Sequence, residues 1–408
     1  MKPFIILGVL IISAGSWCCN SGWAQGTDDP VIAEMISHVA DSTMRQSISG
    51  LQSFGTRYSY ASNRDTVARW IRQRFIAAGV TDVELDGFTL SGSVHNVNVV
   101  ATIHGAPWSG AEIVIGAHYD SYSQTPMVSA PGADDDASGT SAVIELARVI
   151  SILGYSPNLT LRFVAFSGEE QGLVGSSNYA QRAKNTGRHI RAMLNFDQIG
   201  YRTMGDLDVP IVWYERGEEL RDLATAVTRQ YTTLNPLLST EPRARSDSYS
   251  FAQMQYPAVW WLEHYGTPFY HSTYDLVDYI DVSFAADIAR SALALVLTLD
   301  KATVDVHPVP ETVPAAVHLY QNYPNPFNPV TQIPFTIAES REYGGRSTEV
   351  RLVVCDLLGR EVAVLVNEKK PPGSYEVKFD ASGLATGVYL YRLSAGNFIQ
   401  TCKMLVAK

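Results

Sequence analysis

The chain has 408 residues, of which 46% are hydrophobic and 18% charged, so it is long enough for two or three domains and at least one large core. Its net charge is −10 and uneven: residues 317–408 carry +2 and the remainder −12. An acidic body with no run of lysine and arginine argues against nucleic-acid binding and against attachment to an anionic membrane surface.

The first 24 residues have the pattern of an export signal. Lys2 precedes the apolar run FIILGVLIISAG, and Gly22 and Ala24 stand at the −3 and −1 positions of a cleavage site. A membrane anchor is the weaker alternative, because the run is short for a span. We therefore predict a signal peptide at 1–24 and no stable membrane insertion of the mature chain.

Residues 25–303 alternate between strand and helix patterns. The helical periods fall at 65–79, 140–153, 217–231 and 284–300, and the short apolar strands at 111–117, 159–166, 191–196 and 257–262. This alternation predicts an α/β domain with a mixed, mostly parallel sheet sandwiched between helices.

The composition changes after this domain. Residues 304–316 contain Pro308, Pro310 and Pro314 without any helical or strand period, which predicts a stiff linker. Residues 317–408 then alternate with period two around glycine-containing turns, which predicts a small all-β sandwich. Cys355 and Cys402 lie in this module, where they either pair or remain separate buried thiols.

Polar side chains follow the predicted strands at the edge where parallel strands end. Five segments supply them: His118 with Asp120, Asp134 to Asp136, Glu169 with Glu170, Asp197, and a loop with His264 and His271. Sites in open α/β sheets form beyond the carboxyl ends of the strands. One carboxylate pair at a strand end is usually a solvated rim, but so many at one edge would repel one another without cations between them.

The donor types indicate which cation. Imidazole and carboxylate groups without thiolates suit zinc or a similar divalent ion, and two ions at a shared site are a standard arrangement for hydrolysis. Two neutral imidazoles with Asp135, Glu170 and Asp197 carry −3, which two Zn²⁺ ions and a hydroxide balance. Glu169 is then free to handle a proton.

The motifs GAHYD, GADDDASG, FSGEEQGLVGS, NFDQIG and YHSTYD, in this order and spacing, resemble the secreted di-zinc aminopeptidases of metallopeptidase family M28. The resemblance covers roughly residues 30–300. It implies a mixed sheet of about eight strands between helices, with one zinc on a His and a Glu, the other on an Asp and a His, and a second Asp as a bridge.

Carried over by motif, the resemblance implies five metal ligands: His118, Asp135 as the bridge, Glu170, Asp197 and His271. It also implies that Asp120 orients His118 and that Glu169 is the general base. Tyr270 matches a phenol with which some members stabilise the tetrahedral intermediate.

Some residues have competing interpretations. His264 follows its strand directly, but only His271 stands in the YHSTYD context, so we favour His271 as the last ligand. Asp134 and Asp136 are interpreted as caps of the helix that follows them.

Aromatic residues and a departure from the family pattern lie near the predicted site in the sequence. We expect the core, more than the substrate pocket, to hold Trp260, Trp261 and Tyr256. Many family members have SDH where this chain reads Asp247-Ser248, a departure that affects specificity more than metal binding.

The C-terminal module has its own resemblance. Its motifs YQNYPNPFNPVTQIPF, DLLGREVAVLV and FDASGLATGVYLYRL are similar to sorting domains of the type IX secretion system. This implies passage across the outer membrane, with the secretion machinery as a partner. A carbohydrate- or protein-binding β-sandwich is the alternative.

Together these features predict a secreted or cell-surface zinc aminopeptidase. It would hydrolyse N-terminal residues from peptides with a water activated by two zinc ions and with Glu169 as base. The alternatives are a related zinc enzyme on the same fold, either a carboxypeptidase or a one-zinc glutaminyl cyclase, and a non-catalytic surface binding module. The sequence leaves the preferred N-terminal residue and the oligomeric state open.

Overall fold

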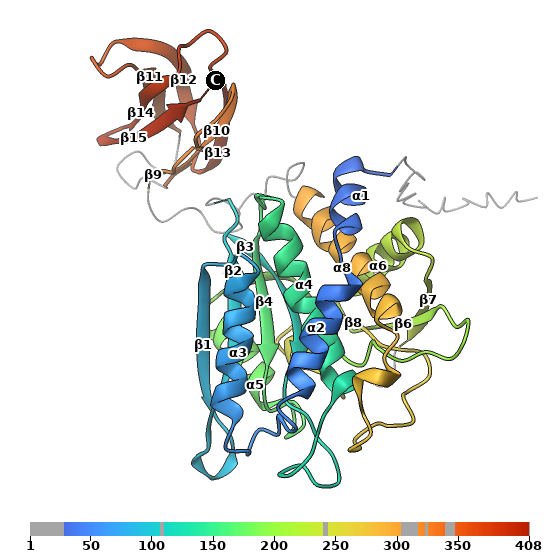
Figure 1. Ribbon diagram of the computed structural model, residues 1–408. Helices are drawn as coiled ribbons and strands as arrows, with labels where there is room; N and C mark the ends of the chain where they lie inside the picture. The colour runs from blue at the N-terminus through green and yellow to red at the C-terminus, as the bar shows by residue number, and fades with distance from the viewer. Residues whose placement is uncertain are drawn as a thin grey trace, which may run out of the picture.

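The computed structural model describes residues 28–106, 110–239, 244–302, 317–322, 325–338 and 347–407. The predicted signal peptide, 1–24, and the predicted linker, 304–316, lie outside these residues. What is described forms an α/β unit, from α1 to α8, and a β unit, from β9 to β15 (Figure 1).

Strands and helices alternate along most of the α/β unit. Its helices are α1 (Pro30–Ser37), α2 (Asp41–Gln52), α3 (Arg64–Ala77), α4 (Gly139–Ile152), α5 (Val174–Asn185), α6 (Glu218–Tyr231), α7 (Ser248–Gln253) and α8 (Val282–Ala302). Its strands are β1 (Asp82–Thr89), β2 (His95–Ile103), β3 (Ala111–His118), β4 (Thr160–Phe166), β5 (His189–Phe196), β6 (Asp208–Trp213), β7 (Asn235–Ser239) and β8 (Ala258–Trp261).

The strands form one mixed sheet in the order β1-β2-β4-β3-β5-β8-β6-β7. The four central strands, β4, β3, β5 and β8, run parallel, whereas β2 and β6 pair antiparallel to the two sides of this group. Parallel strands need a crossover connection, and α4 lies in the connection from β3 to β4 and α5 in the connection from β4 to β5, on the other side of β3. The carboxyl ends of the four central strands therefore share one edge of the sheet.

Helices cover both faces of the sheet. Successive side chains of its central strands point to opposite faces, and side chains on both faces are apolar. On β3, Ile113 and Ile115 join the larger core with α1, α2, α3, α4, α6 and α8, while Val114 joins the smaller core with α5 and α7. Both faces are thus buried, which explains why these strands read as continuous apolar runs. Helix α8 is long and apolar enough to pass a test for a membrane span, but most of its residues are buried in the core.

The predicted fold class is confirmed, and each predicted helix and strand of this unit is present with ends shifted by a few residues. The eight-stranded sheet also agrees with the family resemblance. The elements that the sequence patterns did not predict are α1, α2, α5, α7, β1, β2, β6 and β7. Strand β1 lies at the sheet edge with most of its residues exposed, and α5, VGSSNYAQRAKN, has few apolar residues, so neither shows a strong period.

The β unit has two sheets and its own core. One sheet has the order β13-β10-β9 and the other β12-β11-β14-β15. Their strands are β9 (His318–Leu319), β10 (Val330–Ile337), β11 (Thr348–Cys355), β12 (Glu361–Lys370), β13 (Gly373–Asp380), β14 (Gly387–Ala395) and β15 (Phe398–Val406). Side chains from both sheets, among them Phe335 and Leu352, form one apolar cluster. The all-β prediction is confirmed, and Cys355 and Cys402 are free thiols.

Because each unit has its own core, we predict that a chain ending at residue 303 folds and keeps the catalytic rate of the full chain to within about twofold. A chain ending at residue 283 loses α8, whose buried Leu293, Leu295 and Leu297 each contribute about 1.5–3 kcal/mol, and should not fold. Circular dichroism and turnover of the two truncated chains beside the full chain test this. Loss of turnover in the 303 chain, with its fold and metal content intact, would show that the β unit contributes to the active site.

Candidate metal centre

The predicted site residues meet at the carboxyl edge of the central strands. His118 is the last residue of β3, Glu169 and Glu170 follow β4, and Asp197 follows β5 directly. Asp135 lies in the segment 133–138 before α4, and His271 lies in the loop after β8. The chain thus brings five separate segments to one place, as the parallel order of the strands requires.

One group of donors surrounds His118. Its Nε2 atom lies 3.2 Å from Oδ1 of Asp135 and 3.5 Å from Oδ1 of Asp197. All three side chains are buried, and their donor atoms lie within 4.8 Å of one another. Such a set of one imidazole and two carboxylates can hold a divalent cation.

A second group surrounds His271. Its Nε2 atom lies 3.3 Å from Oδ2 of Asp135 and 3.0 Å from Oε2 of Glu170. Asp135 therefore presents one oxygen to each imidazole and belongs to both groups. A carboxylate shared in this way is the arrangement expected of a bridge between two ions.

The charged groups of the site shift one another's pKa values. Burial, followed by the charge of Asp135, raises the pKa of Glu170 to about 7. Burial alone would lower the pKa of His271, but its contacts with Asp135 and Glu170 raise it to about 10. Oε1 of Glu170 is buried and has no hydrogen-bond partner among the described residues. Buried carboxylates this close together are stabilised when a cation lies between them. The mixture of imidazole and carboxylate donors fits zinc.

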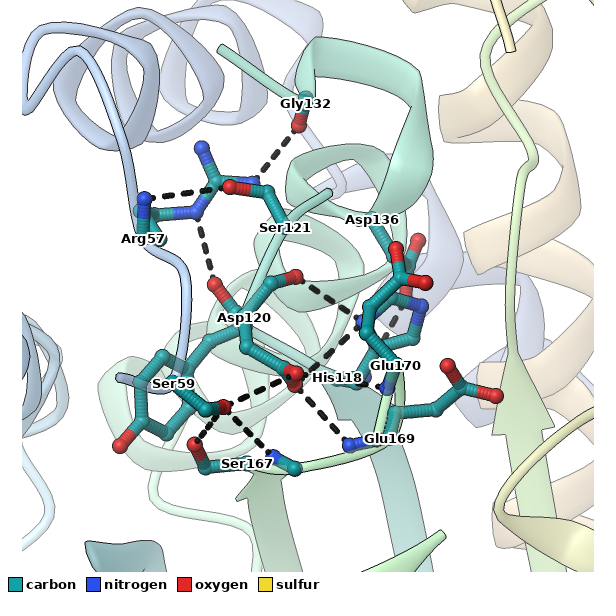
Figure 2. A network of polar contacts seen from close by, with 12 residues as sticks. Arg57, Ser59, His118, Asp120, Ser121, Gly132, Asp136, Ser167, Glu169 and Glu170 are labelled. Carbon is teal, nitrogen blue, oxygen red and sulfur yellow. Dashed lines mark hydrogen bonds and ion pairs between the residues drawn. The ribbon is translucent and has the colours of Figure 1, made fainter. Parts of the chain in front are cut away.

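Asp120 supports the two glutamates and lies beside His118 (Figure 2). Its carboxylate oxygens accept hydrogen bonds from the backbone amides of Glu169, at 3.2 Å, and Glu170, at 3.4 Å, and from Oγ of Ser59, at 3.0 Å. The hydrogen-bond partner of Nδ1 of His118 is instead the backbone carbonyl of Asp120, at 3.0 Å, while the carboxylate is 3.7 Å away. Asp120 thus contacts both His118, at the end of β3, and the loop that follows β4.

The two adjacent glutamates point in different directions (Figure 2). Both line a cavity of about 340 Å³, but only Glu170 contacts His271. No described residue donates a hydrogen bond to the carboxylate of Glu169, and burial raises its pKa well above the ordinary value. The two side chains therefore have different environments despite their neighbouring positions.

The imidazole that contacts Asp135 and Glu170 is that of His271, whereas His264 lines the same cavity but belongs to another group. His264 contacts Asp206, at 3.2 Å, and Asp208, at 3.6 Å, in a separate and partly exposed group. The Tyr270 ring stacks on that of His271, with centroids 3.8 Å apart, and is 51% exposed beside the cavity.

Three residues that the sequence analysis did not identify hold the loop of Asp135. Asp275, the last residue of the YHSTYD motif, accepts hydrogen bonds from the amides of Asp134, at 2.8 Å, and Asp135, at 3.1 Å. The buried Arg57 donates to the backbone carbonyls of Tyr119, Pro131 and Gly132 at 2.5–2.7 Å. Glu263 lies beside Asp134, and burial and that neighbour raise the pKa of Glu263 to about 12.

The capping prediction holds for one aspartate of the pair. Oδ1 of Asp136 accepts a hydrogen bond from the amide of Gly139, the first residue of α4, at 2.8 Å. Oδ1 of Asp134 instead accepts one from the amide of Gly200, at 2.8 Å, so the prediction is wrong for Asp134. Asp134 connects the loop to the segment that follows β5 and does not reach the helix amides.

The aromatic residues near the rim are buried, as expected: Trp260, Trp261 and Tyr256. Trp260 also contributes to the cavity wall. At the departure from the family pattern, Ser248 is buried and its hydroxyl lies 2.9 Å from that of Tyr214. Asp247 is buried with both carboxylate oxygens lacking a partner among the described residues, and burial raises its pKa to about 7.

Comparison with known proteins gives two matched regions. Residues 98–296 match peptidase family M28, and residues 321–408 match the secretion system C-terminal sorting domain. Leucine aminopeptidase 1 of Fusarium vanettenii is 32% identical over 291 residues, which cover 66% of this chain and 72% of the relative. A probable zinc metalloprotease of Pyrenophora teres is 36% identical over 194 residues, 42% of this chain and 41% of the relative.

Solved structures share the fold. The aminopeptidase LapA of Legionella pneumophila has a TM-score of 0.61 at 22% identity and covers 68% of this chain and 78% of its own. A glutaminyl cyclase of Bacteroides thetaiotaomicron has a TM-score of 0.51 at 14% identity, with 64% and 98% covered. With the matched regions and the curated relatives, these comparisons confirm both family resemblances: the chain belongs to peptidase family M28 and ends in a type IX sorting domain.

Proposed function

We propose that this peptidase is an exported aminopeptidase that removes N-terminal residues from peptides with two zinc ions. The ions would be held by His118, Asp135, Glu170, Asp197 and His271. The observation that carries this proposal is the position of Asp135, whose two oxygens face two different imidazoles. A single ion would leave one of the two imidazole–carboxylate groups without a role.

The donor set fits this assignment. Each group offers one imidazole nitrogen and two carboxylate oxygens, so each leaves a position open, as catalytic zinc sites do. When bound, the two ions supply Lewis acidity that polarises the peptide carbonyl and makes a water molecule acidic near neutral pH.

Glu169 is proposed as the general base. Its carboxylate borders the cavity and receives no hydrogen bond from described residues, so it is free to accept the proton of the attacking water. It then delivers this proton to the nitrogen of the leaving amine. Asp120 holds the backbone amides of Glu169 and Glu170, which keeps the base and the ligand apart.

Tyr270 is proposed to stabilise the oxyanion. Its ring is fixed against His271, and burial, together with the nearby Asp135, raises the pKa of its hydroxyl. The phenol therefore stays protonated at neutral pH and can donate a hydrogen bond to the carbonyl oxygen as negative charge develops there.

The cavity favours a free amino group over a free carboxylate. Its lining carries five carboxyl side chains, Asp135, Glu169, Glu170, Asp197 and Glu263, and a single arginine, Arg245. The two ions would balance Asp135, Glu170 and Asp197, which leaves Glu169 to attract a positively charged N-terminus. The C-terminus of a carboxypeptidase substrate needs cations, and the lining offers one arginine for it. This charge pattern supports the aminopeptidase over the carboxypeptidase.

A one-zinc glutaminyl cyclase is the second candidate, because a glutaminyl cyclase shares the fold. Zinc content and a substrate panel separate the two. We expect the full chain to release the N-terminal residue from leucine p-nitroanilide, to leave N-acetyl-leucine p-nitroanilide intact, and not to cyclise an N-terminal glutamine. Cyclisation by a protein with one zinc would overturn the proposal.

The sorting domain supports export to the cell surface or beyond it. Under this proposal the β unit is an address that the secretion machinery recognises, and peptide substrates are met outside the cell. The predicted signal peptide would supply the first step of this route.

For metal binding, we predict two zinc ions per chain, with affinity that falls in acid because both imidazoles must be deprotonated to bind. Asp197→Asn should weaken one ion and Asp135→Asn both, because only Asp135 contacts both imidazoles. Metal analysis after dialysis at neutral and acid pH measures this. A fully active protein with one tightly bound zinc would contradict it.

For the two glutamates, we predict that one substitution lowers kcat and the other lowers the zinc content. Glu169→Gln should keep both zinc ions and lower kcat by about 10²–10⁴-fold, because the amide cannot accept a proton. Glu170→Gln, the matched variant, should lose one ion. Zinc content and kcat measured on the same preparations separate the roles, and near-normal kcat in Glu169→Gln would exclude it as the base.

For Asp120, we predict a loss of about 10–100-fold in activity or zinc affinity on replacement by alanine. Asp120→Asn should lose less, because its amide oxygen can still accept one of the two glutamate amides. Asp82→Asn, which changes an exposed aspartate paired with His104, is the control and should have no effect. Equal behaviour of Asp120→Ala and the control would contradict a supporting role.

A further inference from the structure

Three tyrosine rings contact one another in series, beginning at the ring of His271. Tyr122 contacts the ring of His271, with centroids 5.0 Å apart, Tyr58 lies 6.0 Å from Tyr122, and Tyr60 lies 5.6 Å from Tyr58. We call Tyr122, Tyr58 and Tyr60 the tyrosine row. None of the three lines the 340 Å³ cavity, so the row begins at a metal ligand and lies outside that cavity.

The row is built on two segments that are fixed to each other, 55–60 and 121–130. Three hydrogen bonds join them: from the amide of Ala130 to Gly55 O, at 2.8 Å, from Oγ1 of Thr56 to Pro126 O, at 2.7 Å, and from the amide of Arg57 to Oγ of Ser121, at 3.1 Å. The rings are therefore held in place before any ligand arrives, which lowers the entropy cost of binding.

The same surface exposes apolar groups. Tyr122 is 37% exposed, Tyr58 and Tyr60 are half-buried, and Met127 and Val128 in the second segment are 59% and 79% exposed. Exposed apolar side chains gathered beside a catalytic centre mark a binding surface more often than chance exposure does. Tyrosine suits such a surface, because its ring offers apolar contact and its hydroxyl can reach a partner.

We propose that the tyrosine row binds the part of a peptide substrate that follows the scissile bond, with a preference for apolar or aromatic side chains there. The inference rests on the aminopeptidase function proposed above. The N-terminal residue occupies the cavity, so the rest of the peptide must leave past its edge. Tyr122 lies at that edge, against His271.

The spacing of the rings suits an extended peptide. Such a chain advances about 3.3 Å per residue, so side chains on one face repeat about every 6.6 Å. The neighbouring rings of the row are 5.6–6.0 Å apart, which is close to that repeat. Alternate side chains of the substrate can therefore meet successive rings.

Three substrates test the inference: leucine amide, Leu-Gly-Gly-amide and Leu-Phe-Phe-amide. We expect the full chain to prefer Leu-Phe-Phe-amide to Leu-Gly-Gly-amide by about tenfold in kcat/KM. Tyr58→Ala and Tyr60→Ala should lower this preference by about three- to tenfold, through KM, and leave leucine amide hydrolysis within about twofold. Tyr58→Phe and Tyr60→Phe, which keep the rings, are the matched controls and should keep the preference.

The outcomes are distinct. An unchanged preference in both alanine variants overturns the inference, and so does an equal loss with leucine amide, because the rings would then only support the metal centre. Failure of the aminopeptidase function itself appears differently, as no release of leucine from any of the three substrates by the unmodified chain.

Discussion

The site depends on the placement of one carboxylate between two imidazoles. Asp135 contacts His118 through one oxygen and His271 through the other, although these histidines come from segments far apart in the sequence. Its position is fixed by the backbone, since Asp275 accepts its amide hydrogen and Arg57 binds the carbonyls of the residues just before its loop. The contact of Asp135 with both imidazoles therefore depends on the position of this loop.

Asp120 has the corresponding task on the other side of the centre. Its carboxylate gathers two successive amides, and this fixes where the side chains of Glu169 and Glu170 begin. Two adjacent glutamates at a strand end would otherwise repel each other and move apart freely. Here both side chains border the cavity, but only Glu170 contacts His271, and this difference underlies the separate roles proposed for them.

The sequence alone was sufficient to place the central strands and the polar residues at their ends. Strand β4 is an uninterrupted apolar run, and the acids after it, Glu169 and Glu170, must then lie at the edge of the sheet. Arg57 and Asp275 could not be assigned in this way. Arg57 is buried with its bonds on backbone carbonyls, and Asp275 accepts backbone amides, so their partners exist only in the folded loops. The identity of a residue does not indicate which backbone groups its side chain will bind after folding.

The hydrogen bonds of Arg57 determine which residues of this surface can be substituted. The guanidinium holds only main-chain oxygens, of Tyr119, Pro131 and Gly132, at the two ends of the 121–130 segment. Main-chain oxygens are the same whatever side chain a residue carries, so this anchor does not restrict the sequence between its ends. Mutation can therefore alter Tyr122, Met127 or Val128, and with them the surface beside the centre, while the loop that carries Asp135 stays in place. The protein thus separates a surface that is free to vary during evolution from the loop that holds the candidate bridging carboxylate.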